Sequence, residues 1–260
     1  MTLRRPPAPL YLPAVAGVLF LSLPVAGLLL RVPWGRLPAL VGSETVRTAL
    51  RLSLECSLLS LGLCFLLGVP LALVLARSEI AGLAALRAVV TLPMVLPPVV
   101  GGIALLDAFG RRGVAGPVLA AAGIHLPFST AGAVVAETFV ALPFLVIVVE
   151  AGLRQADGRL EEAAATLGAG AWRRLVQVTL PAVAPAVLAG GALSWARALG
   201  EFGCTLTFAG NLPGATQTMP LAAYVALEND PDAALALSLI LLAVSLTVLV
   251  ALRHRWLGTR

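Results

Sequence analysis

Apolar residues along the chain fall into long blocks, and shorter segments with most of the charged side chains separate them. The blocks cover residues 10–30, 48–76, 88–109, 131–149, 182–199 and 233–252. A helix of about 20 residues rises about 30 Å, the thickness of the bilayer's hydrocarbon core. The pattern therefore predicts an all-α membrane protein with six transmembrane helices. Composition agrees, because 59% of the 260 residues are hydrophobic and only 12% are charged.

The first block has a competing interpretation as a cleaved signal peptide, because Arg4 and Arg5 precede it. Its apolar core is longer than that of a typical signal peptide, and no small-x-small cleavage site follows it. We interpret it as an uncleaved first span. We then expect residues 1–42 to hold an N-terminal tail, this span and an extracytoplasmic loop, 43–255 to form the transmembrane core, and 256–260 to be a second tail.

The distribution of arginine predicts the orientation. Six spans place both termini on one side, together with residues 77–87 and 150–181. Eleven arginines lie on that side: Arg4, Arg5, Arg77, Arg87, Arg154, Arg159, Arg173, Arg174, Arg253, Arg255 and Arg260. The opposite loops hold Arg31, Arg36, Arg111 and Arg112, with Arg47 at a helix end. Since basic residues favour the cytoplasm, both termini and the 150–181 loop are predicted to be cytoplasmic.

Composition excludes several classes of chemistry. The chain contains no lysine, so the G-x4-G-K-[ST] phosphate loop cannot occur and any ATP must bind another chain. The arginines are scattered at the ends of apolar segments, which favours topology signals over nucleic-acid binding. Cys56, Cys64 and Cys204 show no C-x-x-C spacing, and the two histidines lie far apart. We expect no metal site and no catalytic residues.

A polar, helix-prone segment interrupts the apolar pattern at residues 159–167. Its two acids, Glu161 and Glu162, cannot lie in hydrocarbon, so we expect a loop helix at the membrane surface. Gly168 is suited to end it. The small side chains of Ala163 and Ala164 would let a partner surface approach closely. An ordinary interfacial amphipathic helix is the alternative.

Two further segments carry candidate functional side chains. Arg197 and Glu201 are four residues apart and can form an ion pair if the helix continues. The pair would either fix the fifth span or line a pathway, and the residue pattern leaves both roles open. Other pathway candidates near this pair are Ser194, Phe202 and Thr205. Residues 210–220 have the Gly, Asn and Pro content of an extracytoplasmic loop, and its polar candidates are Asn211, Gln217 and Thr218.

The loop segment resembles the EAA-x3-G-x9-I-x-LP signature of ABC importer permeases. It reads Glu162-Ala163-Ala164 with Gly168 and then Leu180-Pro181 at the family's offsets, and Val178 replaces the isoleucine. Three longer stretches resemble molybdate permeases in particular: LPMVLPPVVGG, EAAATLGAGAWRRLVQVTLP and ARALGEFGCTLTFAGNLPGATQTMPLAAY. Family members commonly have alanine where Cys204 stands. The resemblance extends over residues 43–255.

The resemblance implies the type I ABC importer permease fold in a multi-pass protein of the cytoplasmic (inner) membrane. Glu162, Ala163, Ala164 and Gly168, with Glu161 beside them, would form a coupling helix that enters a cleft on an ATPase. The implied partners are two ATPase subunits that carry ATP and Mg, a second copy of this permease, an extracytoplasmic oxyanion-binding protein and membrane lipid. The implied cargo is molybdate, with tungstate. No cofactor is expected in this chain.

Three alternatives stay open from the residues. A sulfate or thiosulfate permease of the same architecture shares the GEFG-type and GN-type elements. A secondary transporter driven by an ion gradient is the rival from another class, although such proteins often have carboxylates in the middle of a span. A membrane scaffold that transports nothing is the third.

Overall fold

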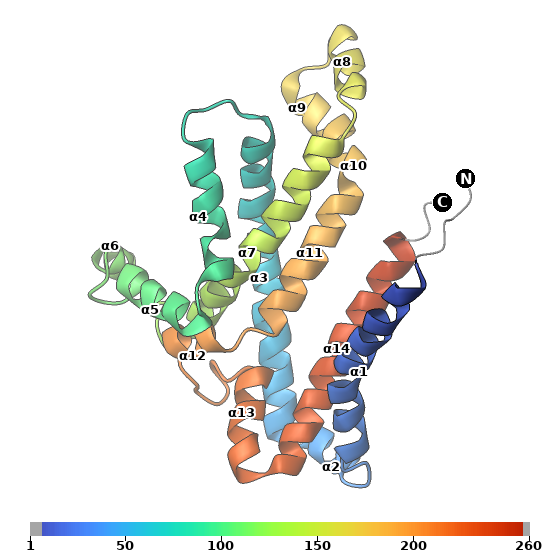
Figure 1. The fold of residues 1–260 in the computed structure, drawn as a ribbon. Coiled ribbons are helices and arrows are strands. Elements are labelled where there is room, and N and C mark those ends of the chain that lie inside the picture. The colour runs from blue at the N-terminus through green and yellow to red at the C-terminus, as the bar shows by residue number, and fades with distance from the viewer. Residues whose placement is uncertain (1–6, 257–260) are drawn as a thin grey trace.

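The computed structural model describes residues 7–256, apart from the side chains of 248, 249 and 251–256. Residues 1–6, from the predicted N-terminal tail, and 257–260, from the predicted tail 256–260, lie outside this part of the chain. All regular elements in the described residues are helices (Figure 1). The first four are a short 3-10 turn, Ala8–Leu10, then α1 (Tyr11–Arg31), α2 (Leu37–Gly42) and α3 (Glu44–Arg77).

The remaining elements are helices of very different lengths. In order they are α4 (Leu83–Val95), α5 (Pro98–Phe109), α6 (Gly116–Ala121), α7 (Thr130–Gln155), α8 (Arg159–Thr166), α9 (Ala171–Arg174), the π-helix η2 (Leu175–Thr179), α10 (Leu180–Ala182), α11 (Ala184–Leu199), α12 (Gly203–Ala209), α13 (Met219–Asn229) and α14 (Pro231–Trp256).

Within the described residues, three helices are long and apolar enough to cross a membrane alone: Ala8–Arg31, Glu44–Arg77 and Thr130–Gln155. A fourth span results if Ala171–Ala182 and Ala184–Leu199 count as one bent helix. The prediction of an all-α membrane protein is confirmed. The count of six spans stays a prediction, because the apolar helices Leu83–Val95 and Pro98–Phe109 are each shorter than a full span.

The third predicted span is wrong as a continuous helix. Residues 88–109 divide into α4 and α5, and the backbone is extended at Leu96 (ψ 133°) and Pro97 (ψ 136°). A proline pushes the residue before it out of the helical region, and here two prolines follow Leu96 in sequence. The break turns α5 sideways, so that α5 and α6 project from the helix bundle (Figure 1).

The fifth predicted span begins earlier than expected and bends. The segment Ala171–Ala182 meets Ala184–Leu199 at 69°, and Val183 lies at the break. The π-helix Leu175–Thr179 lies within the first segment, shortly before the break. π-helical turns are rare and shift the helical register.

The core forms where α3, α7 and α11 lie against one another. Its fully buried residues include Leu75 from α3, Leu145 and Val149 from α7, and Ala198 from α11. Helices in lipid gain little from hydrophobic burial and rely on close packing and hydrogen bonds. Here Thr138 of α7 donates to the Ser60 hydroxyl of α3 at 3.2 Å, and Ser194 of α11 donates to the Ala141 carbonyl of α7 at 3.0 Å.

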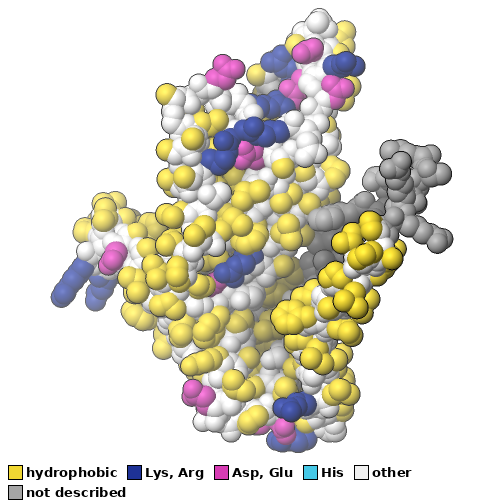
Figure 2. All heavy atoms as spheres, in the orientation of Figure 1, with side chains coloured by type: hydrophobic (Ala, Val, Ile, Leu, Met, Phe, Trp, Pro, Cys, Tyr) yellow, Lys and Arg dark blue, Asp and Glu magenta, His cyan; other side chains and the backbone are white. Residues whose placement is uncertain are grey.

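Helix α1 has an outward apolar surface and no buried residue. Leu12, Phe20 and Leu30 are 82%, 76% and 84% exposed. The same apolar character covers much of the face seen in Figure 2. In water such a surface would be unfavourable, whereas lipid chains can cover it. This arrangement agrees with a location in the membrane.

An arginine–glutamate cluster ties the end of α3 to α4 and α7. Two arginines share Glu150 Oε1: Arg87 donates from Nε and Nη2 at 3.1 and 2.8 Å, and Arg154 donates from Nε at 3.0 Å. Both guanidinium groups also donate to the carbonyl oxygen of Leu75 at 3.2 Å. Carbonyls in the last turn of a helix lack helical partners, so these bonds satisfy one at the end of α3.

We expect Glu150→Gln to destabilise the protein by about 1–3 kcal/mol, because two half-exposed guanidinium groups then lose their shared carboxylate. The measurement is the melting temperature of the purified protein in detergent. Glu55→Gln is the matched control, since the Arg51–Glu55 pair is exposed and joins residues of one helix. Equal melting temperatures for the two variants would show that the cluster does not hold α3, α4 and α7 together.

Candidate functional site

Helix α8 is the outermost element at one end of the molecule, beyond the ends of α7 and α10 (Figure 1). It begins after Asp157, whose carboxylate accepts a hydrogen bond from the Arg159 N–H at 3.0 Å. Its end at Gly168 is as predicted. Gly168 has φ +82°, its N–H donates to Ala165, and the Ala169 N–H donates to Ala164, both at 3.0 Å. This is a Schellman ending, which favours glycine because of the left-handed φ.

The two glutamates of α8 have different surroundings. Glu161 forms a bidentate pair with Arg77 at the end of α3, with distances of 2.7 Å (Nη1–Oε2) and 2.6 Å (Nη2–Oε1). Its Oε1 also accepts a hydrogen bond from the Thr179 hydroxyl. The hydrogen bond from Arg77 is the main reason that the pKa of Glu161 lies below its ordinary value of 4.5. Glu162, by contrast, is exposed and forms no ion pair in the described residues.

The loop that carries Glu162 also carries exposed apolar side chains. Leu160 is 59% exposed, Leu167 is 88% exposed and Trp172 is 76% exposed. Ala163 is exposed and Ala164 is half-buried. Large apolar side chains on a surface that also carries charge are typical of protein interaction sites. We call Leu160, Glu162, Ala163, Leu167 and Trp172 the outer face of the loop.

Glu161 connects this loop to two other parts of the chain. Arg77 belongs to the last turn of α3, and Thr179 ends the π-helix that leads into α11. Thr179 is only 2% exposed. Glu161 therefore links α8 to the end of α3 by an ion pair and to the π-helix before α10 by a hydrogen bond.

At the other end of α11, Arg197 pairs with Glu201 at 2.6 Å. The helix ends at Leu199, so the pair does not lie on a continuous helix and instead spans the break before α12. Glu201 Oε1 accepts a hydrogen bond from the Cys204 N–H at 2.9 Å, which joins the pair to the start of α12. The Glu201 side chain is 1% exposed, and that of Arg197 is 29% exposed.

The neighbouring candidates are mostly inside the protomer. Ser194 and Thr205 are fully buried. Phe202 is half-buried and packs against Tyr224, with ring centroids 5.2 Å apart and planes at 52°. Glu137 of α7 is also buried, at 1% exposure, and its Oε2 has no hydrogen-bond partner in the described residues. Of this group only Arg197 and Phe202 reach the protomer surface.

The third candidate segment forms a compact turn. The Thr216 hydroxyl accepts a hydrogen bond from the Leu212 N–H, and the Thr130 hydroxyl donates to the Ala215 carbonyl, both at 2.8 Å. Asn211 and Gln217 are half-buried and Thr218 is buried. The structure keeps this turn apart from α8: it contacts the start of α7, whereas α8 follows the end of α7.

Nothing in the sequence indicated the two partners of Glu161. Arg77 is 84 residues from Glu161 and Thr179 is 18 residues away. Neither has a local signal, because an ion pair between helix ends depends on how the helices pack. The burial of Glu137 has no local signal either, because it depends on how α7 packs against its neighbours.

Comparison with known proteins identifies the family. Residues 68–260 match the family described as "Binding-protein-dependent transport system inner membrane component". The molybdenum transport system permease protein ModB of Mycobacterium tuberculosis is 51% identical over 245 residues, covering 94% of this chain and 93% of the relative. The chain belongs to this family of inner-membrane transport components, whose members are permease subunits rather than enzymes.

A more distant relative and a solved structure complete the comparison. The sulfate transport system permease protein CysW of Synechococcus elongatus is 38% identical over 181 residues, covering 70% of this chain and 63% of the relative. A chain from the crystal structure of a bacterial alginate ABC transporter, in complex with an alginate-bound periplasmic protein, superposes with a TM-score of 0.76. It is 21% identical and covers 94% of this chain and 91% of its own, so it shows that the folds agree.

We expect Glu161→Gln to loosen α8 and Glu162→Gln to leave it ordered, because only Glu161 is bound to Arg77 and Thr179. Amide hydrogen exchange of residues 159–168 measures this, with faster exchange expected for Glu161→Gln alone. Because the pKa of Glu161 is lowered, the pair stabilises the loop above pH 4.5 and the effect is lost as the pH falls through the lowered pKa. Equal exchange in both variants at pH 7 would contradict the anchoring role.

Proposed function

We propose that this chain is the permease subunit of an ATP-driven importer that carries molybdate, and tungstate with it, across the cytoplasmic membrane. The observation that carries the proposal is the identity of 51% to a molybdenum permease over nearly the whole of both chains. In the proposed complex two copies of this chain form the pathway. Two ATPase subunits hold ATP and Mg, and an extracytoplasmic binding protein delivers the oxyanion.

The topology of the proposal has both termini, the 77–87 segment and the 150–181 loop in the cytoplasm. The arginine bias supports this orientation. The start of α1 and the end of α14 lie on one side of the molecule (Figure 1). Lipid covers α1, and no nucleic acid takes part.

The α8 loop is the proposed coupling element. Its outer face, with Glu162 as the charged group and Leu167 and Trp172 as apolar anchors, enters a cleft on the ATPase. Glu161 faces inward and keeps α8 in register with α3 and the π-helix. When ATP binding brings the ATPase subunits together, α8 moves as a rigid body and α11 follows it.

The pathway is proposed to run along the dimer axis, beside α11 and the α4–α5 break. Arg197 is the cationic group that reaches this surface, and Glu201 neutralises most of its charge. A dianion can then be attracted without being trapped. The buried positions of Ser194 and Thr205 support a role in packing rather than direct contact with the cargo.

A sulfate permease is the second candidate, supported by the relative CysW at 38% identity. Its lower identity and shorter coverage favour molybdate. For an ion-gradient-driven transporter, the buried carboxylate of Glu137 would be the supporting feature, but such a protein has no need of an exposed coupling helix.

Uptake of labelled molybdate tests both parts of the proposal, in cells that lack their own system and supply this chain with its ATPase and binding protein. We expect uptake that survives excess sulfate. We expect Glu162→Arg to abolish it, because the reversed charge meets the ATPase cleft.

Glu79→Arg is the matched control, since Glu79 is an exposed acid on another loop of the same predicted side. It should leave uptake near the wild-type level. Uptake blocked by sulfate would reassign the cargo to sulfate, and no uptake by an assembled complex would refute molybdate transport.

Arg197→Ala should lower both protein abundance and uptake, because it leaves the buried Glu201 carboxylate without its partner. Arg197→Lys should restore protein abundance, because a lysine can also pair with Glu201. The uptake rate of this variant, measured at normal abundance, then shows whether Arg197 acts in the pathway. The measurements are membrane protein level and initial uptake rate. If Arg197→Ala changes neither, Arg197 has no role in the pathway or in pairing.

A further inference from the structure

The loop between α5 and α6 holds two adjacent arginines at its apex, Arg111 and Arg112. The chain on either side is joined by backbone hydrogen bonds: Val114 N–H donates to Asp107 at 3.0 Å, and Ala115 N–H donates to Ala108 at 2.8 Å. These bonds close residues 107–115 into a tight loop. The arginines are therefore presented from a fixed backbone.

The closed loop leaves no room for a side chain at two glycine positions. A Cβ atom on Gly113 would lie 2.5 Å from the Asp107 carbonyl oxygen, and one on Gly116 would lie 2.0 Å from that of Gly110. Both contacts are with backbone, which cannot move aside as a flexible side chain can. Any other residue at either position would open the loop and displace Arg111 and Arg112.

The two arginines are exposed, and within the described residues neither forms an ion pair. In the proposed topology they lie on the extracytoplasmic side, where short loops tend to lack basic residues. Arg36, on the same side, is paired with Asp232. Arg111 and Arg112 thus keep a positive charge available at the outer surface.

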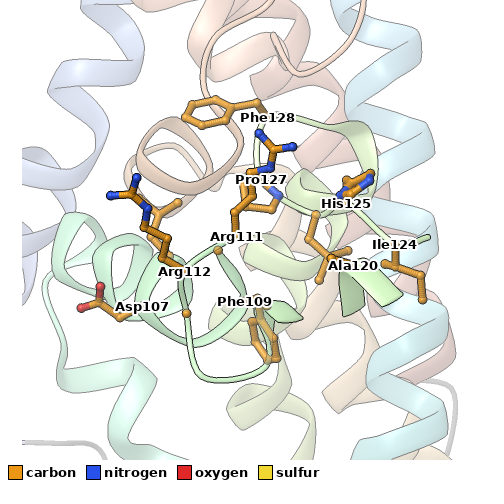
Figure 3. Close-up of a pocket in the computed structure, with 14 residues that line it drawn as sticks. Asp107, Phe109, Arg111, Arg112, Ala120, Ile124, His125, Pro127 and Phe128 are labelled. Atoms are coloured by element: carbon orange, nitrogen blue, oxygen red, sulfur yellow. The ribbon is translucent and has the colours of Figure 1, made fainter. Parts of the chain in front are cut away.

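A cavity of about 580 Å³ adjoins the loop, and its lining includes Arg111, Arg112, His125 and Phe128 (Figure 3). The Arg111 side chain extends toward Pro127 and Phe128, while Arg112 points to the other side of the loop. Phe128 has φ +58°, a left-handed conformation that is unfavourable for a bulky residue, and is 61% exposed. The backbone thus holds an aromatic ring outward beside the arginines.

We propose that Arg111, Arg112 and the rim of this cavity form the docking surface for a carboxylate-rich face of the extracytoplasmic binding protein. This inference rests on the proposed function and its topology. Arginine and aromatic side chains together are typical of the centre of protein interfaces. Unpaired guanidinium groups would steer an acidic partner toward the outer opening and orient it there.

The apolar rim favours a protein over the free oxyanion as the ligand. Val114 is 92% exposed, Val118 is 73% exposed and Ile124 is 46% exposed. A hydrated dianion gains nothing from contact with such apolar side chains. A protein surface can cover the rim and pair with the arginines at once. An anionic lipid headgroup is the alternative that the experiment must separate.

The test measures binding of the transporter's own binding protein, loaded with its own oxyanion, to the complete complex in nanodiscs of neutral lipid. For the double variant Arg111→Glu/Arg112→Glu we expect association to slow by on the order of tenfold at low salt, with a weaker dependence on salt. The lysine pair Arg111→Lys/Arg112→Lys should remain close to the wild type. Arg31→Glu, an exposed arginine on the same predicted side, should change little.

The other outcomes overturn the inference. Unchanged association in the glutamate variant would refute the docking surface. A defect that appears only in nanodiscs with anionic lipid would also refute it and would assign the arginines to lipid headgroups. A loss of direct oxyanion binding, measured without the binding protein, would refute it as well. This experiment measures protein association, so its result can be interpreted even if the cargo is not molybdate. The uptake assay tests the identity of the cargo separately.

Discussion

The close packing of α3, α7 and α11 is the interaction on which the other features depend. In lipid these helices gain little from burying apolar surface, so direct contact and a few hydroxyl bonds must hold them together. The bonds from Thr138 to Ser60 and from Ser194 to the Ala141 carbonyl fix α7 between the other two helices. Once the three helices are fixed, their ends are fixed as well. Arg77 then lies where α8 can reach it.

The two adjacent glutamates of α8 show how one short helix can serve two surfaces. Successive residues on a helix point about 100° apart, so one acid can face the protein while the next faces outward. Glu161 is bound on two sides and makes α8 part of the membrane domain. Glu162 remains exposed beside Leu167 and Trp172. A helix without such contacts could be displaced without moving the membrane helices. The contacts of Glu161 would instead transmit a displacement of α8 to α3 and to the π-helix.

The sequence was sufficient for features that depend on composition or short spacing. Long apolar blocks predicted a helical membrane protein, and Gly168 predicted the end of the loop helix. The spacing of Arg197 and Glu201 suggested pairing along one helix, whereas the two residues pair across the end of α11. The continuous span over 88–109 failed because an apolar pattern does not register backbone breaks, and Pro97 and Pro98 break the chain between α4 and α5. The Arg77–Glu161 pair could not be predicted, because its partners are 84 residues apart and meet only after the helices pack.

The arginines differ in whether a carboxylate pairs with them, according to their depth in the protein. This difference agrees with the proposed transport of an anion. At the proposed outer surface Arg111 and Arg112 have no carboxylate partner in the described residues, so their field extends into solution. Deeper in, Arg197 is paired with a buried glutamate, and at the opposite end two arginines share one carboxylate, Glu150. An unpaired arginine inside would bind a dianion tightly and slow its release, because low dielectric strengthens attraction. The pairing of Arg197 with Glu201 would reduce this attraction, so that a dianion could pass the arginine without binding tightly to it.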